Sequence, residues 1–316
     1  YKSSFNEDIS RWDVSAVTDM NGMFFMAGAF NQPIGDWNVS SVTNMQEMFD
    51  GAGSFNQPIG NWDLSSVTNI RRMLRYASDF NQPIGNWDVS AVTKMDGMFF
   101  MAVAFNQPIG DWNVSSVTNM QEMFDGAGSF NQPIGNWDVK LVTNMHRIFR
   151  GTYSFDQDIS DWNVSGATTM AEMFVNSNAV SDSNKGLIHQ SFSSNSNWPY
   201  DWSEFMPNSP PSDLNFAAPL TIAENQPIGT VVGEFNATDP DANATLTYHL
   251  VSGAGDGNNS MFLLDANGTL KTVTTFDFES NASTYSIRVQ AKDEHNATVE
   301  GNFTVTLTDA NDPATG

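Results

Sequence analysis

Acidic and amide side chains stand on both sides of a tryptophan that recurs through the first half of the chain. Each of the seven pairs flanks its tryptophan by one residue and contains one Asp, never two. Such oxygens suit a cationic or hydroxyl-rich ligand, or calcium held between repeats. A neutral partner also dilutes the repulsion between stacked carboxylates. Both interpretations stay open for the ligand-binding candidates, which are Asp13, Asp36, Asn38, Asn61, Asp63, Asn86, Asp88, Asp111, Asn113, Asn136, Asp138, Asp161 and Asn163.

The tryptophans that position these pairs recur at a fixed step of 25 residues, from Trp12 to Trp162. A phenylalanine keeps the same step from Phe5 to Phe155. A fixed period in this range is typical of a solenoid, in which each unit buries its apolar face against its neighbours. A longer shift of 75 residues relates much of the first repeats to later ones, which indicates that three repeats were duplicated as a block.

The apolar frame I-x-x-W-x-V-x-x-V of each unit matches the spacing of a leucine-rich repeat. Trp37 and Val39 alternate as in a short strand, and stacked units would pair such strands in parallel about 4.8 Å apart. Residues 43–52 follow helical spacing, and Thr43 with Gln46 fits a capping box. The sequence therefore predicts an α/β leucine-rich-type solenoid with a parallel sheet.

Other columns of the repeat carry further expectations. Asn31 and its equivalents, each followed by Gln, predict an amide ladder that bonds the turn backbones. The threonine column favours capping over an ice-binding surface. Charged residues such as Asp50 follow the Met-Phe pair, or its Met-Leu or Ile-Phe equivalent, in four units, whereas two units have Phe25 and Phe100 there. These two rings form either an exposed apolar patch for a partner or a pair covered by a flanking segment.

The motif W-[DN]-V-S-x-V-T-N-M-x-x-M-F, followed by F-N-Q-P-I, resembles the BspA-type leucine-rich repeats of bacterial surface proteins. The resemblance covers residues 5–174. It implies a displayed adhesin that binds a host or environmental ligand. We therefore expect an extracellular location on a bacterial cell surface and a protein, peptide or glycan ligand.

The 25-residue period ends after Phe174. Residues 175–206 are rich in Ser and Asn but contain several aromatic side chains, which is typical of a cap that covers the open end of a solenoid. The alternative for Trp198, Tyr200 and Trp202 is a sugar-stacking platform. A proline-rich linker follows at residues 207–213. The expected first domain is therefore 1–206, with repeats at 5–174 and the cap after them.

The remaining residues, 214–316, show period-2 alternation between turn residues, which predicts about seven strands and an all-β, Ig-like sandwich. Motifs such as A-E-N, D-P-D, D-F-E and A-K-D resemble those of a bacterial cadherin-like domain over residues 214–313. The resemblance implies calcium as a cofactor and further sandwich domains of the same chain as partners. It places six ligands at the far end of the sandwich, which are Glu224, Asp277, Glu279, Asp309, Asn311 and Asp312.

The resemblance also implies a second set of ligands at the near end of the sandwich, where the linker enters. This set is Asp239, Asp241 and Asp293. A cadherin-like domain would receive a D-x-N-D-N linker here, which this chain lacks. Only Asp213 or Asn215 could substitute for it.

Composition narrows the functional classes. Thirty-six acidic residues against thirteen basic ones give a net charge of −23, which disfavours nucleic acid and anionic membranes as partners. The chain has no cysteine and no apolar run long enough to cross a bilayer. Its four histidines are scattered and no catalytic motif is present, so we expect a binding protein and no enzyme. A structural stalk without a ligand is the main alternative, and a glycosidase with paired Asp residues is a weaker one.

Because the chain begins within the repeat pattern at Tyr1, we also expect a piece of a longer protein.

Overall fold

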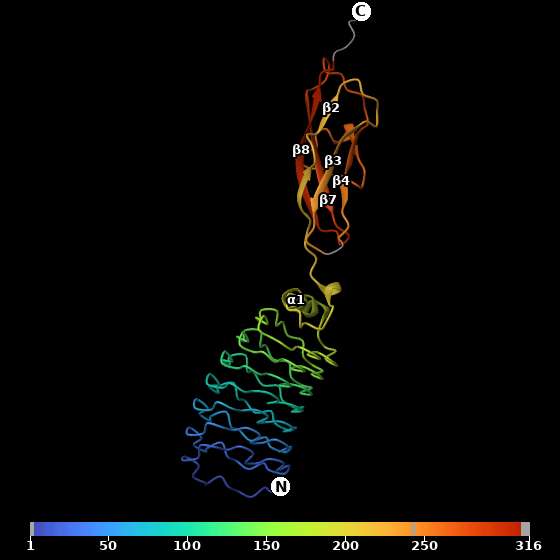
Figure 1. Cartoon of the computed structure of the whole chain (residues 1–316). Helices are drawn as coiled ribbons and strands as arrows, with labels where there is room; N and C mark the ends of the chain where they lie inside the picture. The colour runs from blue at the N-terminus through green and yellow to red at the C-terminus, as the bar shows by residue number, and fades with distance from the viewer. Residues whose placement is uncertain (1–2, 242–243, 311–316) are drawn as a thin grey trace, which may run out of the picture. The chain divides into compact units, whose positions relative to one another are not determined.

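The structure is a computed structural model, and it describes residues 3–241 and 244–310. The chain divides into two compact units, Tyr1–Pro207 and Asn208–Gly316 (Figure 1). The first unit is a stack of repeat coils followed by a short helix, and the second is built of strands. No helix in the described part of the chain is both long and apolar enough to cross a membrane.

Each 25-residue coil consists of turns and makes one β-bridge to each adjacent coil. In the second coil, Asn44 pairs in parallel with Asn69 of the third. Alternate backbone N–H groups then donate to the next coil, from Met45 to the Asn69 carbonyl and from Glu47 to the Arg71 carbonyl, both at 2.9 Å. Residues between them close local turns onto the carbonyl three positions earlier. Neighbouring coils are therefore joined by a short hydrogen-bonded seam.

The predicted strand at Trp37–Val39 and the predicted helical turn at 43–52 are both wrong in the described repeats. Two residues of each coil have positive φ, at 55° for Glu47 and 77° for Gly51 in the second coil. A left-handed residue every four positions interrupts an extended strand as well as an α-helix. The α/β solenoid with a parallel sheet is thus replaced by coils of turns with single parallel bridges.

The threonine column does not cap a helix. The Thr43 hydroxyl donates to the Thr18 carbonyl of the preceding coil at 3.1 Å, and the same bond recurs along the stack to Thr168. The Asn ladder has the predicted partners, although its groups are partly rather than fully buried. The Asn31 side-chain oxygen accepts the Asn56 N–H at 3.0 Å and the Gln57 amide at 2.9 Å. Both columns join coils through repeated, identical bonds.

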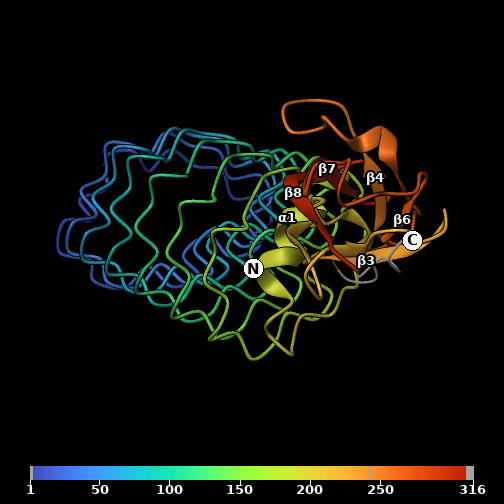
Figure 2. The same ribbon diagram turned by 90° about the horizontal axis from the view of Figure 1, so that it is seen from above.

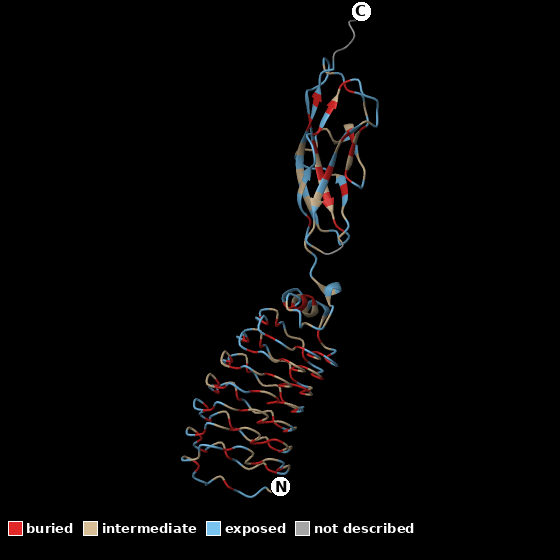
Figure 3. Ribbon diagram, in the orientation of Figure 1, coloured by how far each residue is buried: buried red, intermediate tan, exposed pale blue. Residues whose placement is uncertain are grey.

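Aromatic rings fill the interior of the stack. Buried residues recur along its successive coils in Figure 3, and Figure 2 shows these coils from above. Phe55 stacks on its equivalents Phe30 and Phe80, with 5.9 Å between ring centroids in each pair. A second phenylalanine column packs against the first, so that the centroids of Phe49 and Phe55 are 3.9 Å apart. The Trp62 indole N–H donates to a carbonyl of the preceding coil, at 3.1 Å. The repeated methionines of the described coils are mostly buried with these rings, so the apolar frame of the repeat is its core.

The segment after the last coil folds back over the end of the core. It contains α1 (Asp182–Phe192) and the 3₁₀-helix η1 (Ser203–Phe205). The backbone N–H of Phe174 donates to the Tyr200 hydroxyl at 2.7 Å, and the Trp198 indole donates to His189 Nδ1 at 3.0 Å. These aromatic side chains pack against the core. They therefore cover apolar surface that the end of the stack would expose.

The second unit is a sandwich of two four-stranded sheets, so the predicted all-β sandwich is confirmed. Apart from the parallel pair β2–β8, the pairings in the described sheets are antiparallel. One sheet has the order β1 (Ser212–Phe216), β3 (Val231–Thr238), β6 (Thr269–Thr272) and β5 (Phe262–Leu264), with the 3₁₀-helix η2 (Asn259–Met261) before β5. The other has the order β2 (Thr221–Ala223), β8 (Thr298–Thr308), β7 (Thr284–Lys292) and β4 (Thr247–Leu250).

Burial along the strands explains the sandwich. In β7 every second residue, from Tyr285 through Ile287 and Val289 to Ala291, is buried. A strand with this alternation places one face in the core and the other in solvent. The loops that carry acidic residues therefore emerge at the ends of the sandwich, beyond the buried faces.

Candidate functional site

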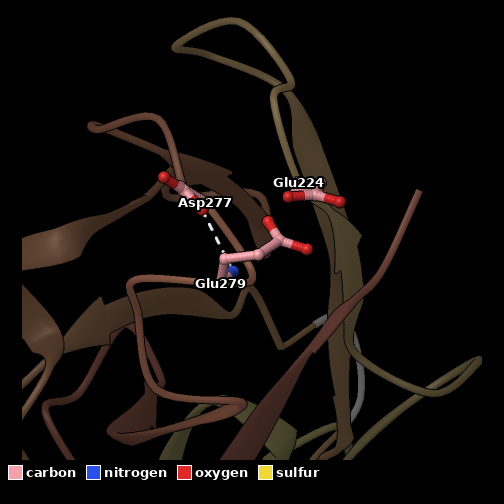
Figure 4. Close-up of side chains that lie close together, drawn as sticks. All are labelled: Glu224, Asp277 and Glu279. Carbon is pink, nitrogen blue, oxygen red and sulfur yellow. Dashed lines mark hydrogen bonds between the residues drawn. The ribbon is translucent and has the colours of Figure 1, made fainter. Parts of the chain in front are cut away.

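Three carboxylates meet at one end of the sandwich (Figure 4). Glu224 directly follows β2, whereas Asp277 and Glu279 lie on the loop between β6 and β7. One oxygen from each of the three residues lies within 4.8 Å of the other two. In the described residues this is the one group of three acidic or histidine side chains with such spacing. Two chain segments more than fifty residues apart thus build one acidic cluster.

Backbone N–H groups orient the cluster. Glu224 is only 1% exposed, and its two carboxylate oxygens accept the N–H groups of Phe278 and Ala310, each at 2.9 Å. Asp277 Oδ1 accepts the N–H of Glu279 at 3.0 Å. Because each oxygen has more than one lone pair, these bonds fix the carboxylates and leave acceptor capacity.

The protonation behaviour of the cluster follows from its bonds and charges. N–H donation from Phe278 and Ala310 lowers the pKa of Glu224, and hydrogen bonding from Ser280 lowers that of Asp277. A bond from its own backbone N–H lowers the pKa of Glu279, but desolvation and the charges of Glu224 and Asp277 outweigh it, so the net direction is upward. The three groups therefore repel one another as anions.

The donor set fits calcium. Calcium takes six to eight hard oxygen ligands in flexible geometry, and carboxylates are its usual protein ligands. Glu224, Asp277 and Glu279 offer only oxygen, are already oriented, and repel in the absence of a cation. A bound ion would neutralise this repulsion and cross-link β2 to the loop before β7. These three residues are therefore the ones that would hold it.

Asp309 directly follows β8, and its side chain is exposed. Its neighbour Ala310 donates to Glu224, so the backbone of this segment reaches the cluster. The predicted ligands Asn311 and Asp312 lie outside the described residues. Of the six far-end candidates, the structure thus brings Glu224, Asp277 and Glu279 together and places the start of the segment with Asp309 beside them.

The near-end candidates Asp239, Asp241 and Asp293 do not form a group of the same closeness in the described structure. Their carboxylate oxygens accept hydrogen bonds from backbone N–H groups and from residues at the start of the second unit. Asp239 Oδ1 accepts the Asp241 N–H at 2.9 Å. Its Oδ2 is buried and has no hydrogen-bond partner in the described part of the chain. An orphaned carboxylate oxygen of this kind is compatible with a cation ligand.

Two residues that the sequence interpretation missed complete this end. The Asn208 side-chain amide donates to Asp293 at 2.9 Å, and the Ser209 N–H donates to Asp241 at 2.7 Å. Asp213, the expected substitute for the missing linker ligand, instead accepts the Thr238 hydroxyl at 3.1 Å. The signal was an Asn-Ser pair two residues before the first strand, in the position of an incoming linker.

The Asp/Asn candidates of the repeats are all exposed, as expected. The residue after each tryptophan, whether Asp63 or Asn38, accepts the N–H of the residue two positions later, at 3.0–3.2 Å in every described coil. This is the Asx turn that both residue types form. Hydrogen bonds from Ser65 lower the pKa of Asp63. The column after the tryptophan thus has a local structural role, and the described coils bring no three of its carboxylates into one cluster.

An exposed apolar patch at Phe25 and Phe100 would require this column of the repeat to lie on the surface, but its charged residues are not all exposed. Asp50 is 2% exposed and lies 3.4 Å from Arg75 of the next coil. Asp125 lies 3.9 Å from Arg150. Phe25 and Phe100 occupy the same column and are half-buried, whereas the methionines after them are exposed. Sequence reasoning missed these ion pairs, for which the signal was an Asp and an Arg one period apart.

Comparisons with known proteins match the two units separately. The repeats match the family model described as "Mycoplasma protein of unknown function, DUF285" over residues 1–100 and 80–186, and a cadherin domain model matches 218–308. The Drosophila melanogaster "Protocadherin-like wing polarity protein stan" is 32% identical over 114 residues, which cover 34% of this chain and 3% of that protein. The "Fat-like cadherin-related tumor suppressor homolog" of the same species is 37% identical over 100 residues, 30% of this chain and 2% of that protein.

Among solved structures, extracellular cadherin domains 1–4 of Protocadherin Gamma B7 are 30% identical over 33% of this chain and 25% of that chain, with a TM-score of 0.28. The chain spans only a few per cent of the two curated relatives. A cadherin domain is consistent with an extracellular adhesion module, and kinship of the repeats with BspA-type proteins stays a prediction. Because the DUF285 matches together span residues 1–186, more than half of the chain, the chain belongs to the DUF285 family and carries a cadherin domain after its repeats.

Proposed function

We propose that this chain is a non-catalytic adhesion module of a bacterial cell surface. In this proposal the repeats bind an extracellular protein, peptide or glycan, and the cadherin domain extends them and joins further domains of the same kind. The observation that carries the proposal is the oriented cluster of Glu224, Asp277 and Glu279 at the end of a cadherin domain. The family description, which names Mycoplasma, supports the bacterial setting.

Calcium has a defined place in the proposal. A cation bound by the three carboxylates would offset their mutual repulsion and hold the end of β2 to the loop before β7. The orphaned oxygen of Asp239 supports a second, weaker site at the opposite end. In each case the ion would stiffen an end of the sandwich. A stiff end suits a domain that must keep a binding surface away from a cell.

Calorimetric melting of the whole chain, with calcium and with a chelator, tests the calcium part. At calcium concentrations about 100-fold above Kd, we expect the sandwich to gain about 2.7 kcal/mol. Glu224→Gln should remove most of this gain, since it replaces the buried negative carboxylate with a neutral side chain of similar shape. Asp63→Asn, on an exposed turn of the repeats, is the matched control and should keep the gain. A sandwich transition that does not respond to calcium would contradict the proposal.

Binding of the whole chain to arrays of glycans and peptides tests the adhesion part. We expect at least one ligand class to bind through the repeats, with affinity that survives removal of the sandwich's calcium. No binding at high protein concentration, with or without calcium, would favour the structural stalk. That alternative has support in the structure, because one column of the polar strip is occupied by turn-forming bonds.

A further inference from the structure

The duplicated block of the repeats differs between its two copies at very few positions. Residues 12–63 and 87–138 are identical except for Asp19 against Lys94, Asn21 against Asp96, and Gly28 against Val103. The first two of these differences exchange polar side chains on the same turn. The structure places both Lys94 and Asp96 in the lining of one surface hollow. The second copy therefore differs from the first where it helps to form a concave polar surface.

This hollow, here called the basic hollow, has a volume of about 380 Å³. That volume falls within the range of about 300–1,000 Å³ of small-molecule sites. Its lining includes Arg71, Arg72 and Lys94, three of the thirteen basic residues of a chain whose net charge is −23. Asp96 and Glu122 also line it, and Glu47 beside the hollow pairs with Arg72, so three cations stand against three anions. Three cations gathered in so acidic a chain favour an anionic group where one of them is left without an anionic partner.

The three cations are not equivalent. Arg71 Nε donates to Asp96 Oδ2 at 2.6 Å, and Arg72 Nη1 lies 3.7 Å from Glu47 Oε1. Both arginines are thereby partly compensated and fixed in place. Lys94 is exposed, and in the described part of the chain its ammonium group has no ion-pair partner. Lys94 is therefore the cation that an incoming anion would meet.

Neighbouring coils hold the rest of the hollow in shape. The Arg72 N–H donates to the Asp96 carbonyl at 3.0 Å, and the Gly97 N–H donates to the Gln121 carbonyl at 2.7 Å. Gly97 has φ of +61°, and a Cβ there would approach Arg72 Cγ to 3.2 Å. The aliphatic part of the Arg72 side chain thus packs against the next coil at Gly97, where there is no side chain. The walls of the hollow are set by the backbone seam before any ligand binds.

Amide and hydroxyl groups complete the lining. Gln46, Asn119, Gln121 and Thr118 all face the hollow. The Gln121 side-chain oxygen accepts the Asn144 amide at 3.0 Å, which orients the group and leaves its NH₂ as a donor. Groups that both donate and accept suit the hydroxyls of a sugar ring. Most small-molecule sites are lined by hydrophobic side chains, whereas the lining of this hollow is polar. It therefore does not suit an apolar ligand.

We propose that the basic hollow binds an acidic sugar, a pyranose that carries a carboxylate or a sulfate. Lys94 pairs with the anionic group, the arginines add positive potential, and the amides bind ring hydroxyls. The proposal deepens the adhesion function, on which it rests, by naming a site and a ligand class. Carboxylated and sulfated sugars share this chemistry, and the experiment separates them.

Titration calorimetry with the whole chain tests the site. The probes are trigalacturonate, a sulfated disaccharide and the neutral sugar maltotriose. We expect one or both acidic sugars to bind and the neutral one to bind at least tenfold more weakly. The double variant Lys94→Asp with Asp96→Asn should weaken binding at least tenfold. Because the first copy already has Asp19 and Asn21 in these places, the coil should tolerate the change.

Lys140→Asn is the matched control, since Lys140 is exposed and lies outside the hollow. It lowers the net charge by one, as the double variant does, and should leave binding unchanged. Equal loss in both variants would show non-specific attraction and overturn the site. Equal binding of maltotriose, or preference for a Glu-rich peptide over both sugars, would overturn the ligand class. If the arrays find another ligand on the repeats while acidic sugars fail, the adhesion proposal stands and this one does not.

Discussion

The two units use their carboxylates in opposite ways. In the repeats, residues such as Asp63 and Asp88 stand one to a coil, and each accepts bonds from a serine two positions later. In the sandwich, Glu224, Asp277 and Glu279 converge within 4.8 Å. Both units draw on the same strongly acidic composition. Composition alone therefore does not indicate calcium, whereas convergence of oriented carboxylates from separate segments does.

The same contrast holds for how each unit is stabilised. Each coil forms hydrogen bonds and ring contacts with adjacent coils of similar sequence, so that rings, amides and threonines form ladders across coils. The sandwich obtains its core from strands with different sequences and has its polar cluster at one end. A substitution in the repeats should thus disturb the two adjacent coils, whereas one in the sandwich acts within a single core.

The largest effect should come from the aromatic ladder. Phe105 is fully buried and stacks on Phe80 and Phe130 at 6.2 and 6.0 Å. We expect Phe105→Ala to cost about 3–5 kcal/mol of unfolding free energy in the repeats. Phe216→Ala, on an edge strand of the sandwich where the ring is 38% exposed, should cost much less. Chemical denaturation measures both, followed by tryptophan fluorescence for the repeats and by far-ultraviolet circular dichroism for the sandwich, which contains no tryptophan. Equal losses would contradict the ladder as the main source of stability.

The amide ladder should come next. The Asn56 side-chain oxygen accepts the Asn81 N–H and the Gln82 amide, both at 3.0 Å. Asn56→Ala leaves these partly buried donors without an acceptor and should cost about 1–3 kcal/mol. Asn56→Asp keeps the acceptor, as Asp156 does naturally toward Ser181, and should cost less. An equal loss for both variants in thermal melting would mean that the ladder bonds contribute nothing specific.

The sequence allowed the solenoid, the core columns and the amide ladder to be predicted, because a strict 25-residue period repeats every core contact. It did not allow the backbone conformation of the coils to be predicted. Trp37 and Val39 alternate like strand residues and Met45 and Met48 are spaced like helix residues, yet positive φ at Glu47 and Gly51 excludes both elements. Charged residues such as Glu47 give no local signal for a left-handed conformation, which is fixed here by bonds to the next coil.

In the sandwich, the resemblance to cadherin motifs indicated the cluster of Glu224, Asp277 and Glu279, since these motifs have a fixed order along the chain. The contribution of Asn208 and Ser209 at the other end could not be derived from it. Their bonds to Asp293 and Asp241 depend on how the entering chain folds against two loops far along the sequence. Such contacts follow from the tertiary fold and from no spacing in the sequence.

Buried Asp125 gives the repeats a pH dependence of stability. Desolvation raises its pKa to about 6, although Arg150 and other cations oppose the shift. In the unfolded chain the ordinary value is 3.8, so between these values the folded state holds a proton that the unfolded state releases. Stability from this group is therefore present at low pH and declines as pH rises toward and past 6.

Between pH 5 and 7 we expect the repeats to lose on the order of 1 kcal/mol through Asp125. Asp125→Asn should remove that slope, while Asp63→Asn should keep it, because hydrogen bonds lower the pKa of Asp63. Denaturation at several pH values measures the slope. A wild-type slope that Asp125→Asn leaves intact would assign the pH dependence to other groups. The equivalent residue of the first copy, Asp50, also has its pKa raised by burial, and its contribution stays in both variants.

The smallest effect, and the sharpest test of the comparison, concerns the strip itself. If Asp63 serves only its turn, Asp63→Asn keeps the acceptor oxygen for Ser65 and should change stability by less than about 0.5 kcal/mol, as ordinary surface substitutions do. Asp63→Ala removes the acceptor and should cost about 1 kcal/mol. Neither variant should alter calcium binding. Loss of a calcium response in Asp63→Asn, measured by titration calorimetry, would mean that the repeats hold an ion as the sandwich does, and the contrast between the two units would fail.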